Sequence, residues 1–305
     1  MILILGVTGS GKGRLAFELA CEIGAEIISV DSMKVYRRMD IGTAKPPKQA
    51  LQSVRHHLID VVEPSEPFNV GAFLDLAYSA IAEVKGRGKP IITVGGTALY
   101  IKALLYGLFE GPGCDERIRT RLRELEKSEG AGRLYSRLRE VDPSAAERIH
   151  ANDSKRIIRA LEVYELTGRR ISQLQKQFEA EKPRHEWMII GLRSEKEQAN
   201  RRINQRVKRI LSEGLVDEVE SLLAEERPLS RQAGCAIGYG EIIDYLHGNT
   251  TLEEAVEQIK KNTRRLAKNQ RTWFKTFKNV NWLDVGPEAS AVEILDRVIR
   301  TFEVM

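Results

Sequence analysis

The chain has 305 residues and a net charge of +5, with 42% hydrophobic and 30% charged residues, as expected of a globular protein with one large or two ordinary domains. Its three cysteines, Cys21, Cys114 and Cys235, form no C-x-x-C pair, which argues against a zinc site and gives no support to a disulfide framework. No apolar stretch approaches the roughly 20 residues of a membrane span. We therefore expect a cytoplasmic monomer without a membrane partner; the modest positive charge permits a nucleic-acid partner but does not require one.

The N-terminal part alternates apolar strands with helices. "MILILGV" predicts a buried strand, a helix from about Gly11 to Ile23 follows, and "EIISVD" predicts a second strand that ends in Asp31. We expect a short strand in "HHLIDVV", a helix in "NVGAFLDLAYSAIAEVKGRG" and a strand in "KPIITVGG". The inward face of that helix is predicted to carry Phe73, Ala77, Ala80, Ile81 and Val84. This alternation predicts a parallel sheet covered on both faces.

The middle of the chain changes character after "FEGPG". It reads as consecutive helices, one of which begins at "DPSAAERI", with Asp142 as its cap and Pro143 in its first turn. "HEWMIIGLR" returns to the sheet, and the tail from Glu195 is expected to be helical. We therefore predict an α/β protein with a P-loop NTPase-like core and a parallel sheet, formed by residues 1–112 and 189–305, and a helical insertion domain of residues 113–188.

The sharpest motif is G-x-x-x-x-G-K from Gly6 to Lys12. It lies between a predicted strand and a predicted helix, where backbone N–H groups and the helix N-terminus form an anion site. The next position is normally a Ser or Thr that binds Mg²⁺, but here it is Gly13. Thr8 and Ser10 are the nearby hydroxyls that are candidates to contact phosphate or metal instead.

Two further strand ends carry polar or small residues. Asp31 follows the second strand, and the pair Gly95–Gly96 precedes Thr97 at another. Ligands of open α/β sheets bind outside the carboxyl ends of the strands, so Asp31 is expected beside the loop's phosphates. It is a helix cap, a metal-binding acid or a general base. The glycine pair allows close approach to a ligand or forms a plain turn. Because this strand ends in glycine and not in a metal-directing acid, an ATP site is disfavoured.

The C-terminal helix is strongly basic. No acidic residue occurs between Gln258 and Trp282. Basic residues fall at helical spacing on one face: Arg264, Lys268, Arg271, Lys275 and Lys278. The apolar face, marked by Ile259, Leu266, Trp273 and Phe277, is expected to pack on the core. The absence of acid favours a polyanion partner over a merely solvated face. Smaller basic clusters, which solvated faces explain equally well, occur at Lys155, Arg156 and Arg159 and in "RIRTRLR".

Several stretches occur together in an order that resembles the bacterial tRNA dimethylallyltransferases, of the IPP transferase family. They are "GVTGSGKG", "IISVDSMKVYRRMDIGTAKP", "HHLIDVVEP", "PIITVGGTALYIKALLYG", "RIIRALEVYELTG", "AIGYGE" and "AKNQRTWFK". The resemblance covers nearly the whole chain. The stretch around Asp31 and "VGGTALY" are more specific to this family than a phosphate loop alone.

The resemblance implies transfer of a dimethylallyl group from dimethylallyl diphosphate to the exocyclic amine of the adenine adjacent to the tRNA anticodon. The catalytic residues would be Asp31, as the base, and Thr97. The diphosphate would be bound by Gly6, Val7, Thr8, Gly9, Ser10, Gly11, Lys12 and Gly13. Mg²⁺ is the implied cofactor, held through Ser10 or by the diphosphate alone. The tRNA anticodon stem-loop would be contacted by Asp31, Ser32, Met33, Lys34, Thr97, Arg119, Lys155, Arg156, Ile157, Ile158, Arg159, Arg264, Lys268, Arg271 and Lys275.

Four residues depart from the family pattern. Gly13 replaces the loop hydroxyl, Lys34 a glutamine expected to read the adenine, Gly240 a basic residue expected at the diphosphate, and Asn269 a basic residue of the RNA helix. Three alternatives therefore stay open. They are a P-loop small-molecule kinase, an adenylate prenyltransferase and a catalytically weakened RNA-binding paralogue.

Overall fold

The computed structural model describes residues 1–109, 111–175, 183–286, 293, 296 and 298. The chain divides into two compact units, one of Met1–Leu104 with His185–Met305 and one of Leu105–Arg184. The sequence placed the insertion at residues 113–188, so the second unit begins and ends earlier than that prediction. Among the described residues, no helix is both long and apolar enough to cross a membrane.

The core unit holds, within its described residues, a six-stranded sheet with the order β3-β2-β4-β1-β5-β6, and every neighbouring pair is parallel. The strands are β1 (Ile2–Gly6), β2 (Glu26–Val30), β3 (His56–His57), β4 (Ile91–Gly95), β5 (Met188–Arg193) and β6 (Val280–Asp284). The predicted parallel α/β core is confirmed. The prediction that the tail from Glu195 is helical was incomplete, because β6 pairs with β5 at the sheet edge.

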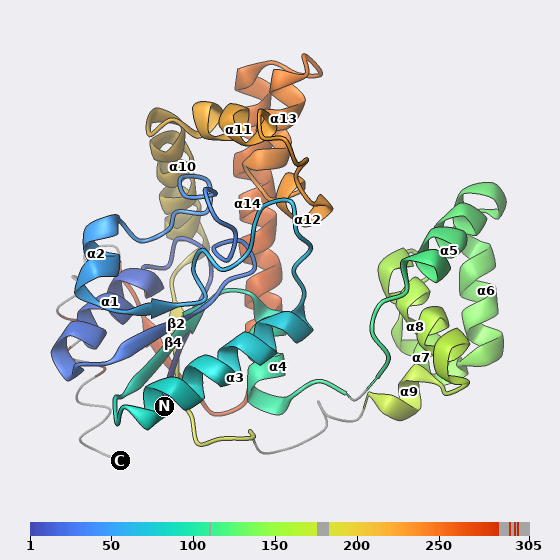
Figure 1. The fold of residues 1–305 in the computed structure, drawn as a ribbon, viewed down its shortest axis with the longest axis horizontal. Helices are drawn as coiled ribbons and strands as arrows, with labels where there is room; N and C mark the ends of the chain where they lie inside the picture. The colour runs from blue at the N-terminus through green and yellow to red at the C-terminus, as the bar shows by residue number, and fades with distance from the viewer. Residues whose placement is uncertain (110, 176–182, 287–292, 294–295, 297, 299–305) are drawn as a thin grey trace. The chain divides into compact units, whose positions relative to one another are not determined.

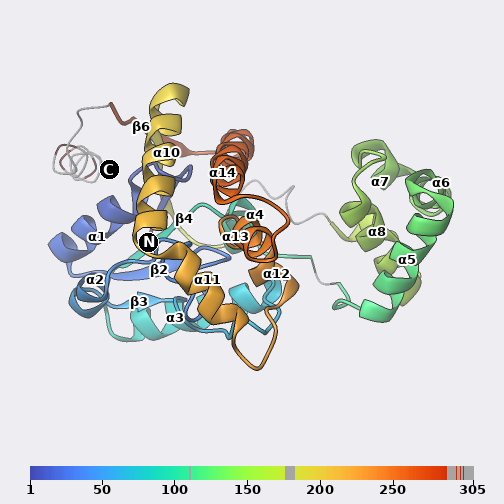
Figure 2. The same cartoon turned by 90° about the horizontal axis from the view of Figure 1, so that it is seen from above.

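Helices cover both faces of the sheet. Successive side chains of each strand point to opposite faces, so the apolar strands present side chains that must be buried on both sides. On one face, Leu15 and Leu19 of α1 (Lys12–Ile23) pack in a cluster with Ile4 of β1 and Ile27 of β2. On the other face lies α3 (Val70–Gly86), against β2 and β4 (Figure 2). Its five predicted inward residues are all buried. Two further helices are α2 (Lys48–Ser53) and α4 (Ala98–Tyr106).

The chain after β5 forms a helical layer next to the sheet, with α10 and α14 side by side (Figure 1). Its helices are α10 (Lys196–Ser212), α11 (Leu215–Leu223), α12 (Arg231–Gly234), α13 (Tyr239–Leu246) and α14 (Leu252–Phe274). The residues that α14 buries are Ala255, Ile259, Ala267, Gln270 and Phe274. Leu266 was wrongly placed on the packed face, because it is 39% exposed. Lys275 caps the helix, and Lys278 lies beyond it.

The insertion unit is a bundle of short helices, and its described residues contain no strand. The helices are α5 (Glu116–Glu129), α6 (Ala131–Val141), α7 (Pro143–Arg148), α8 (Ser154–Thr167) and α9 (Ile171–Leu174). Asp142 caps α7 by accepting from the Ala145 N–H at 3.1 Å, with Pro143 in the first turn as predicted. Buried leucines such as Leu122 and Leu161 form a separate hydrophobic core.

Candidate active site

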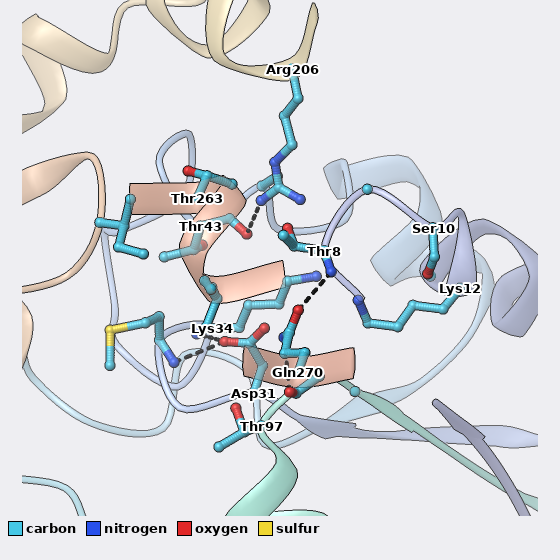
Figure 3. A pocket seen from close by; sticks show the side chains of 18 of the residues that line it. Thr8, Ser10, Lys12, Asp31, Lys34, Thr43, Thr97, Arg206, Thr263 and Gln270 are labelled. Carbon is cyan, nitrogen blue, oxygen red and sulfur yellow. Dashed lines mark hydrogen bonds between the residues drawn. The ribbon is translucent and has the colours of Figure 1, made fainter. Parts of the chain in front are cut away.

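A cavity of ≈ 1050 Å³ opens at the carboxyl edge of the core sheet. The phosphate loop, the residues after β2 and the residues after β4 line one side, and α10, α13 and α14 contribute to the other (Figure 3). These segments meet because parallel strands end at one edge: Gly95 pairs in register with both Leu5 and Val30. The predicted motifs around Lys12, Asp31 and Thr97 therefore line a single cavity.

The phosphate loop turns sharply into α1. Gly9 and Gly11 have φ of 78° and 87°, which side chains other than glycine rarely adopt. The Ser10 N–H donates to the Val7 carbonyl at 3.1 Å, and the Lys12 ammonium folds back on the same carbonyl at 3.3 Å. The loop thus has the conformation of an anion cradle at a helix N-terminus.

Asp31 is held by a local turn directly after β2. Its Oδ1 accepts from the backbone N–H groups of Met33 at 2.9 Å and Lys34 at 3.2 Å. No hydrogen bond to Oδ2 is present among the described residues. Thr97 supports the same turn, since its hydroxyl accepts from the Ser32 N–H at 3.1 Å and lies 3.5 Å from the Ser32 hydroxyl. One carboxylate oxygen is therefore fixed, and the other is left to take a proton.

Three of the six basic residues that line this cavity are half-buried and act electrostatically with Asp31: Lys12, Lys34 and Arg206. Burial is the largest influence on the Lys12 pKa and, with repulsion from Lys34, lowers it to about 7. Burial also lowers the pKa of Lys34, and the nearby Asp31 carboxylate opposes the shift. The pKa of Arg206 is lowered by burial too, again opposed by Asp31. These three cations outnumber the one carboxylate that they share, Asp31. The excess of positive charge favours the binding of an anion in this cavity.

Two residues of the cavity were missed by sequence reasoning. Gln270 lies on the buried side of α14. Its Oε1 accepts from the Thr8 N–H at 2.9 Å, and its Nε2 donates to the Gly96 carbonyl at 2.8 Å. A Cβ at Gly96 would lie 2.6 Å from that Nε2, so this glycine gives the glutamine room. Arg206 extends from α10 into the cavity and donates to the Thr43 carbonyl at 3.2 Å. Single polar residues on helices gave no motif by which to find them.

The protein groups near the loop fit a magnesium ion poorly. Mg²⁺ prefers carboxylate, phosphate and water oxygens in octahedral geometry. Among the described residues, no group of three or more His, Cys, Asp and Glu could hold a metal. The buried Ser10 hydroxyl has no hydrogen-bond partner, but it lies against Gly6, where a Cβ would be 2.6 Å away. Gly13 offers no hydroxyl. Of the two predicted modes, binding through the diphosphate's own oxygens suits this donor set better.

The departures at Gly13 and Gly240 differ in their surroundings. A Cβ at Gly13 would have no heavy atom within 4 Å, and Gly13 lines the cavity. A Cβ at Gly240 would lie 3.1 Å from the Gly234 carbonyl, and Gly240 is absent from the lining. A larger side chain is therefore accommodated at Gly13 and crowded at Gly240.

The residues of the insertion that were predicted to contact RNA fall into two groups. Ile157 and Ile158 are buried in the insertion core, at 1% and 7% exposure, so their side chains pack inside this unit, and the prediction that these two residues contact RNA stays a prediction. Arg119 and Arg159 bond the buried Glu162 at 2.8 and 2.6 Å, which assigns both guanidinium groups a structural role. The exposed pair is Lys155 and Arg156.

On α14, the basic residues predicted for RNA have mixed environments. Lys268 and Lys275 are exposed. Arg264 donates to Asn204 of α10 at 2.9 Å, and Nη2 of Arg271 is buried without a hydrogen-bond partner. None of these four basic residues lines the cavity; the residues of α14 that do are Ile259, Thr263, Leu266, Asn269, Gln270 and Trp273. With about 3.6 residues per turn, the basic stripe lies on a different side of the helix from these residues.

Comparison with known proteins gives one family. The model described as IPP transferase matches residues 34–277, and the model described as isopentenyl transferase matches residues 1–66. A tRNA dimethylallyltransferase 2 of Geotalea uraniireducens is 46% identical, with 99% of this chain and 97% of that protein covered. A tRNA dimethylallyltransferase of Acetivibrio thermocellus is 45% identical, with 93% and 91% covered.

Solved structures give the same result. The tRNA isopentenylpyrophosphate transferase of Bacillus halodurans matches with a TM-score of 0.71 and 40% identity over 99% of this chain and 96% of that chain. A eukaryotic dimethylallyltransferase acting on tRNA matches with a TM-score of 0.77 and 29% identity over 93% and 73%. The resemblance seen in the sequence motifs is therefore confirmed, and the chain belongs to the IPP transferase family.

Proposed function

We propose that this protein transfers a dimethylallyl group from dimethylallyl diphosphate to the exocyclic amine of the adenine adjacent to the anticodon in tRNA. Membership of the family supports the reaction, since the relatives with high identity are named tRNA dimethylallyltransferases. The observation that carries the proposal here is the Asp31 carboxylate, fixed through one oxygen beside the phosphate loop, inside one cavity with Lys12, Lys34 and Arg206.

The diphosphate occupies the phosphate loop. Backbone N–H groups at the start of α1 point at an anion there, and Lys12 and Arg206 add positive charge. The Lys12 ammonium donates to the Val7 carbonyl at 3.3 Å. A bound phosphate would compete for this ammonium, because a charged acceptor forms a stronger hydrogen bond than a carbonyl. As the donor reacts, negative charge grows on the leaving oxygens. These groups are already aimed at that charge, so they stabilise the transition state without reorganising.

The acceptor amine attacks the allylic carbon while the carbon–oxygen bond to the diphosphate breaks. The electron pair of that bond leaves with the diphosphate, and an amine proton passes to Asp31. An adenine amine is a weak nucleophile, so loss of this proton matters to the rate. The backbone N–H groups of Met33 and Lys34 donate to Oδ1 of Asp31, so Oδ2 is the oxygen that accepts the proton. Thr97 keeps this turn in place through Ser32.

The adenine must leave the stacked anticodon loop to reach the cavity. Base flipping of this kind costs a few kcal/mol and is cheapest in single-stranded loops. Leu99 and Leu266, two large apolar side chains that are 41% and 39% exposed, line the cavity and offer apolar surface to a base or to the prenyl chain. The exposed cations of α14 and the insertion pair Lys155–Arg156 would contact the RNA backbone, which positions the loop.

One experiment distinguishes this function from its rivals. Purified protein is incubated with dimethylallyl diphosphate and an anticodon stem-loop, with dimethylallyl diphosphate and adenosine monophosphate, or with ATP and small alcohols. Mass spectrometry then identifies the product. We expect a dimethylallyl adduct on the stem-loop alone. An adduct on the mononucleotide would indicate an adenylate prenyltransferase, and a phosphorylated alcohol a kinase. Tight stem-loop binding with no adduct would indicate a non-catalytic RNA-binding protein.

A further inference from the structure

We propose that Lys34 is a donor-binding residue whose ammonium supplies charge to the diphosphate, so that this chain binds its donor with little dependence on Mg²⁺. The inference rests on the proposed function, because it takes dimethylallyl diphosphate as the occupant of the phosphate loop. It assigns to Lys34 a contact with the donor in place of the contact with tRNA that the resemblance implied.

The position of Lys34 carries the first step. Its backbone N–H is fixed to Oδ1 of Asp31 at 3.2 Å, so the start of the side chain is held at the carboxyl end of β2. From there the side chain extends into the cavity toward Lys12, which extends toward it from α1 (Figure 3). The two ammonium groups lie close enough that Lys34 is the strongest charge acting on Lys12. An anion bound by Lys12 therefore lies within reach of Lys34 as well.

The partners of the Lys34 ammonium carry the second step. Among the described residues, it has neither a hydrogen bond nor an ion pair. The charged groups that face it are Asp31, Arg206, Lys45 and Lys12. Lys45 is neutralised by Asp40 at 2.6 Å and by Asp60. Asp31 is thus the acid shared by the cations that remain. A half-buried ammonium in this setting is costly to leave unpaired, and a bound diphosphate would pair it.

The loop itself carries the third step. The side chain that would hold Mg²⁺ is absent at Gly13, and the Ser10 hydroxyl is buried against Gly6. The start of α1 therefore offers no hydroxyl for a metal ion at Gly13, while the same cavity contains the Lys34 ammonium. With Gly13 and Lys34 together, we expect the Lys34 ammonium to neutralise part of the charge of the diphosphate that a bound metal ion would otherwise neutralise.

The test is a set of binding titrations with inorganic pyrophosphate and with dimethylallyl diphosphate, each done with Mg²⁺ and with a chelator. The natural protein is compared with Lys34→Gln, Lys34→Arg, Gly13→Thr and the double variant Gly13→Thr/Lys34→Gln. Lys48→Gln is the matched control, because Lys48 is an exposed lysine of α2 outside the cavity. Circular dichroism and thermal melting establish that each variant is folded.

We expect the natural protein to bind pyrophosphate about equally with and without Mg²⁺. In the chelator, Lys34→Gln should lose roughly ten- to a hundredfold in affinity, as for one charged contact, while Lys34→Arg keeps most of it and Lys48→Gln all of it. The double variant should recover affinity when Mg²⁺ is present and not in its absence. Unchanged metal-free affinity in Lys34→Gln would overturn the proposal, as would a natural protein that binds pyrophosphate in Mg²⁺ alone.

A parallel transfer assay on the stem-loop separates this inference from the proposed function. If the natural protein prenylates the stem-loop and Lys34→Gln shows the same Mg²⁺ dependence, the role of Lys34 is wrong and the function stands. If pyrophosphate binding depends on Lys34 but no acceptor is prenylated, Lys34 is part of an anion site and the proposed function is wrong.

Discussion

The core cavity and the insertion bundle both contain clusters of basic residues, but their charges are used differently. In the insertion, Arg119 and Arg159 converge on the buried carboxylate of Glu162. Burial alone would raise the pKa of Glu162, but hydrogen bonds from these arginines hold it below the usual value. In the cavity, Lys12, Lys34 and Arg206 face one another around Asp31. A cluster of basic residues therefore predicts an anionic partner only when the folded structure places too few carboxylates beside it. The number of glutamates nearby in the sequence does not show whether this is so.

The largest effect is expected from Asp31→Asn. This change keeps the shape and the acceptor for the Met33 N–H but removes the proton acceptor from the cavity. We expect the single-turnover rate of transfer to the stem-loop to fall by about 10²–10⁴-fold, while affinity for donor and RNA stays within a few-fold. Asp244→Asn, an exposed aspartate of α13, is the control. A near-normal rate in Asp31→Asn would remove Asp31 from the mechanism.

The next largest effect is expected from Gln270→Leu, which removes both bonds that tie the phosphate loop to β4. Leaving buried partners unpaired costs about 1–3 kcal/mol, so donor affinity should fall roughly tenfold with stem-loop affinity unchanged. Gln258→Leu on the exposed side of the same helix should change neither. Equal losses for donor and RNA, in step with the melting temperature, would reduce Gln270 to a packing role.

The pH dependence of donor binding should follow Lys12. Its pKa of about 7 in the free protein will be higher once the diphosphate is bound, because an anion favours the charged form. Affinity is then fullest below pH 7 and falls by up to about tenfold per unit as pH rises above it. Burial is the largest influence on the Lys12 pKa, and Lys34, Asp31 and Arg206, which face the same ammonium, modify it further. Lys12→Arg stays charged and should show a flatter profile in calorimetry with the same donor. Parallel profiles would assign the titration to the donor itself.

A smaller effect is expected from the basic residues of α14. Replacing Arg264, Lys268 and Arg271 by glutamine should weaken stem-loop binding and leave donor binding unchanged. Each phosphate contact that is lost lowers the salt slope of binding by about one unit. An unchanged slope would make these residues a solvated face, as the sequence alone left open.

The smallest effect sharpens the comparison within the insertion. Replacing Lys155 and Arg156 by glutamine should lower the salt slope of stem-loop binding by up to about two units without changing the melting temperature. Replacing Arg119 and Arg159 should instead lower the melting temperature, because the buried Glu162 carboxylate then loses both arginines and keeps the Asp115 N–H alone of its three bonded residues. The opposite assignment of the two effects would refute the division into structural and RNA-facing cations.

The sequence predicted what local motifs and strand ends determine. The phosphate loop, Asp31 and Thr97 meet as expected, because parallel strands place their carboxyl ends at one edge. It missed Gln270 and Arg206, since a polar residue on a helix acquires its partner through packing. It included Ile157 and Ile158 in a predicted RNA contact as part of a short basic stretch, and it did not show that both are buried on α8 beside the exposed Lys155 and Arg156. The short strand β6 pairs with β5 alone and carried too weak a pattern to be recognised.

The central claim is that the acceptor is the exocyclic amine of the adenine beside the anticodon, deprotonated by Asp31. A direct test compares two anticodon stem-loops that differ only at this base. One contains adenine, and the other contains unsubstituted purine, which has the same ring system without the exocyclic amine. Each is incubated with the protein and dimethylallyl diphosphate and analysed by mass spectrometry. We expect one dimethylallyl group on the adenine stem-loop and none on the stem-loop with unsubstituted purine. Equal modification of both, or of neither, would contradict it.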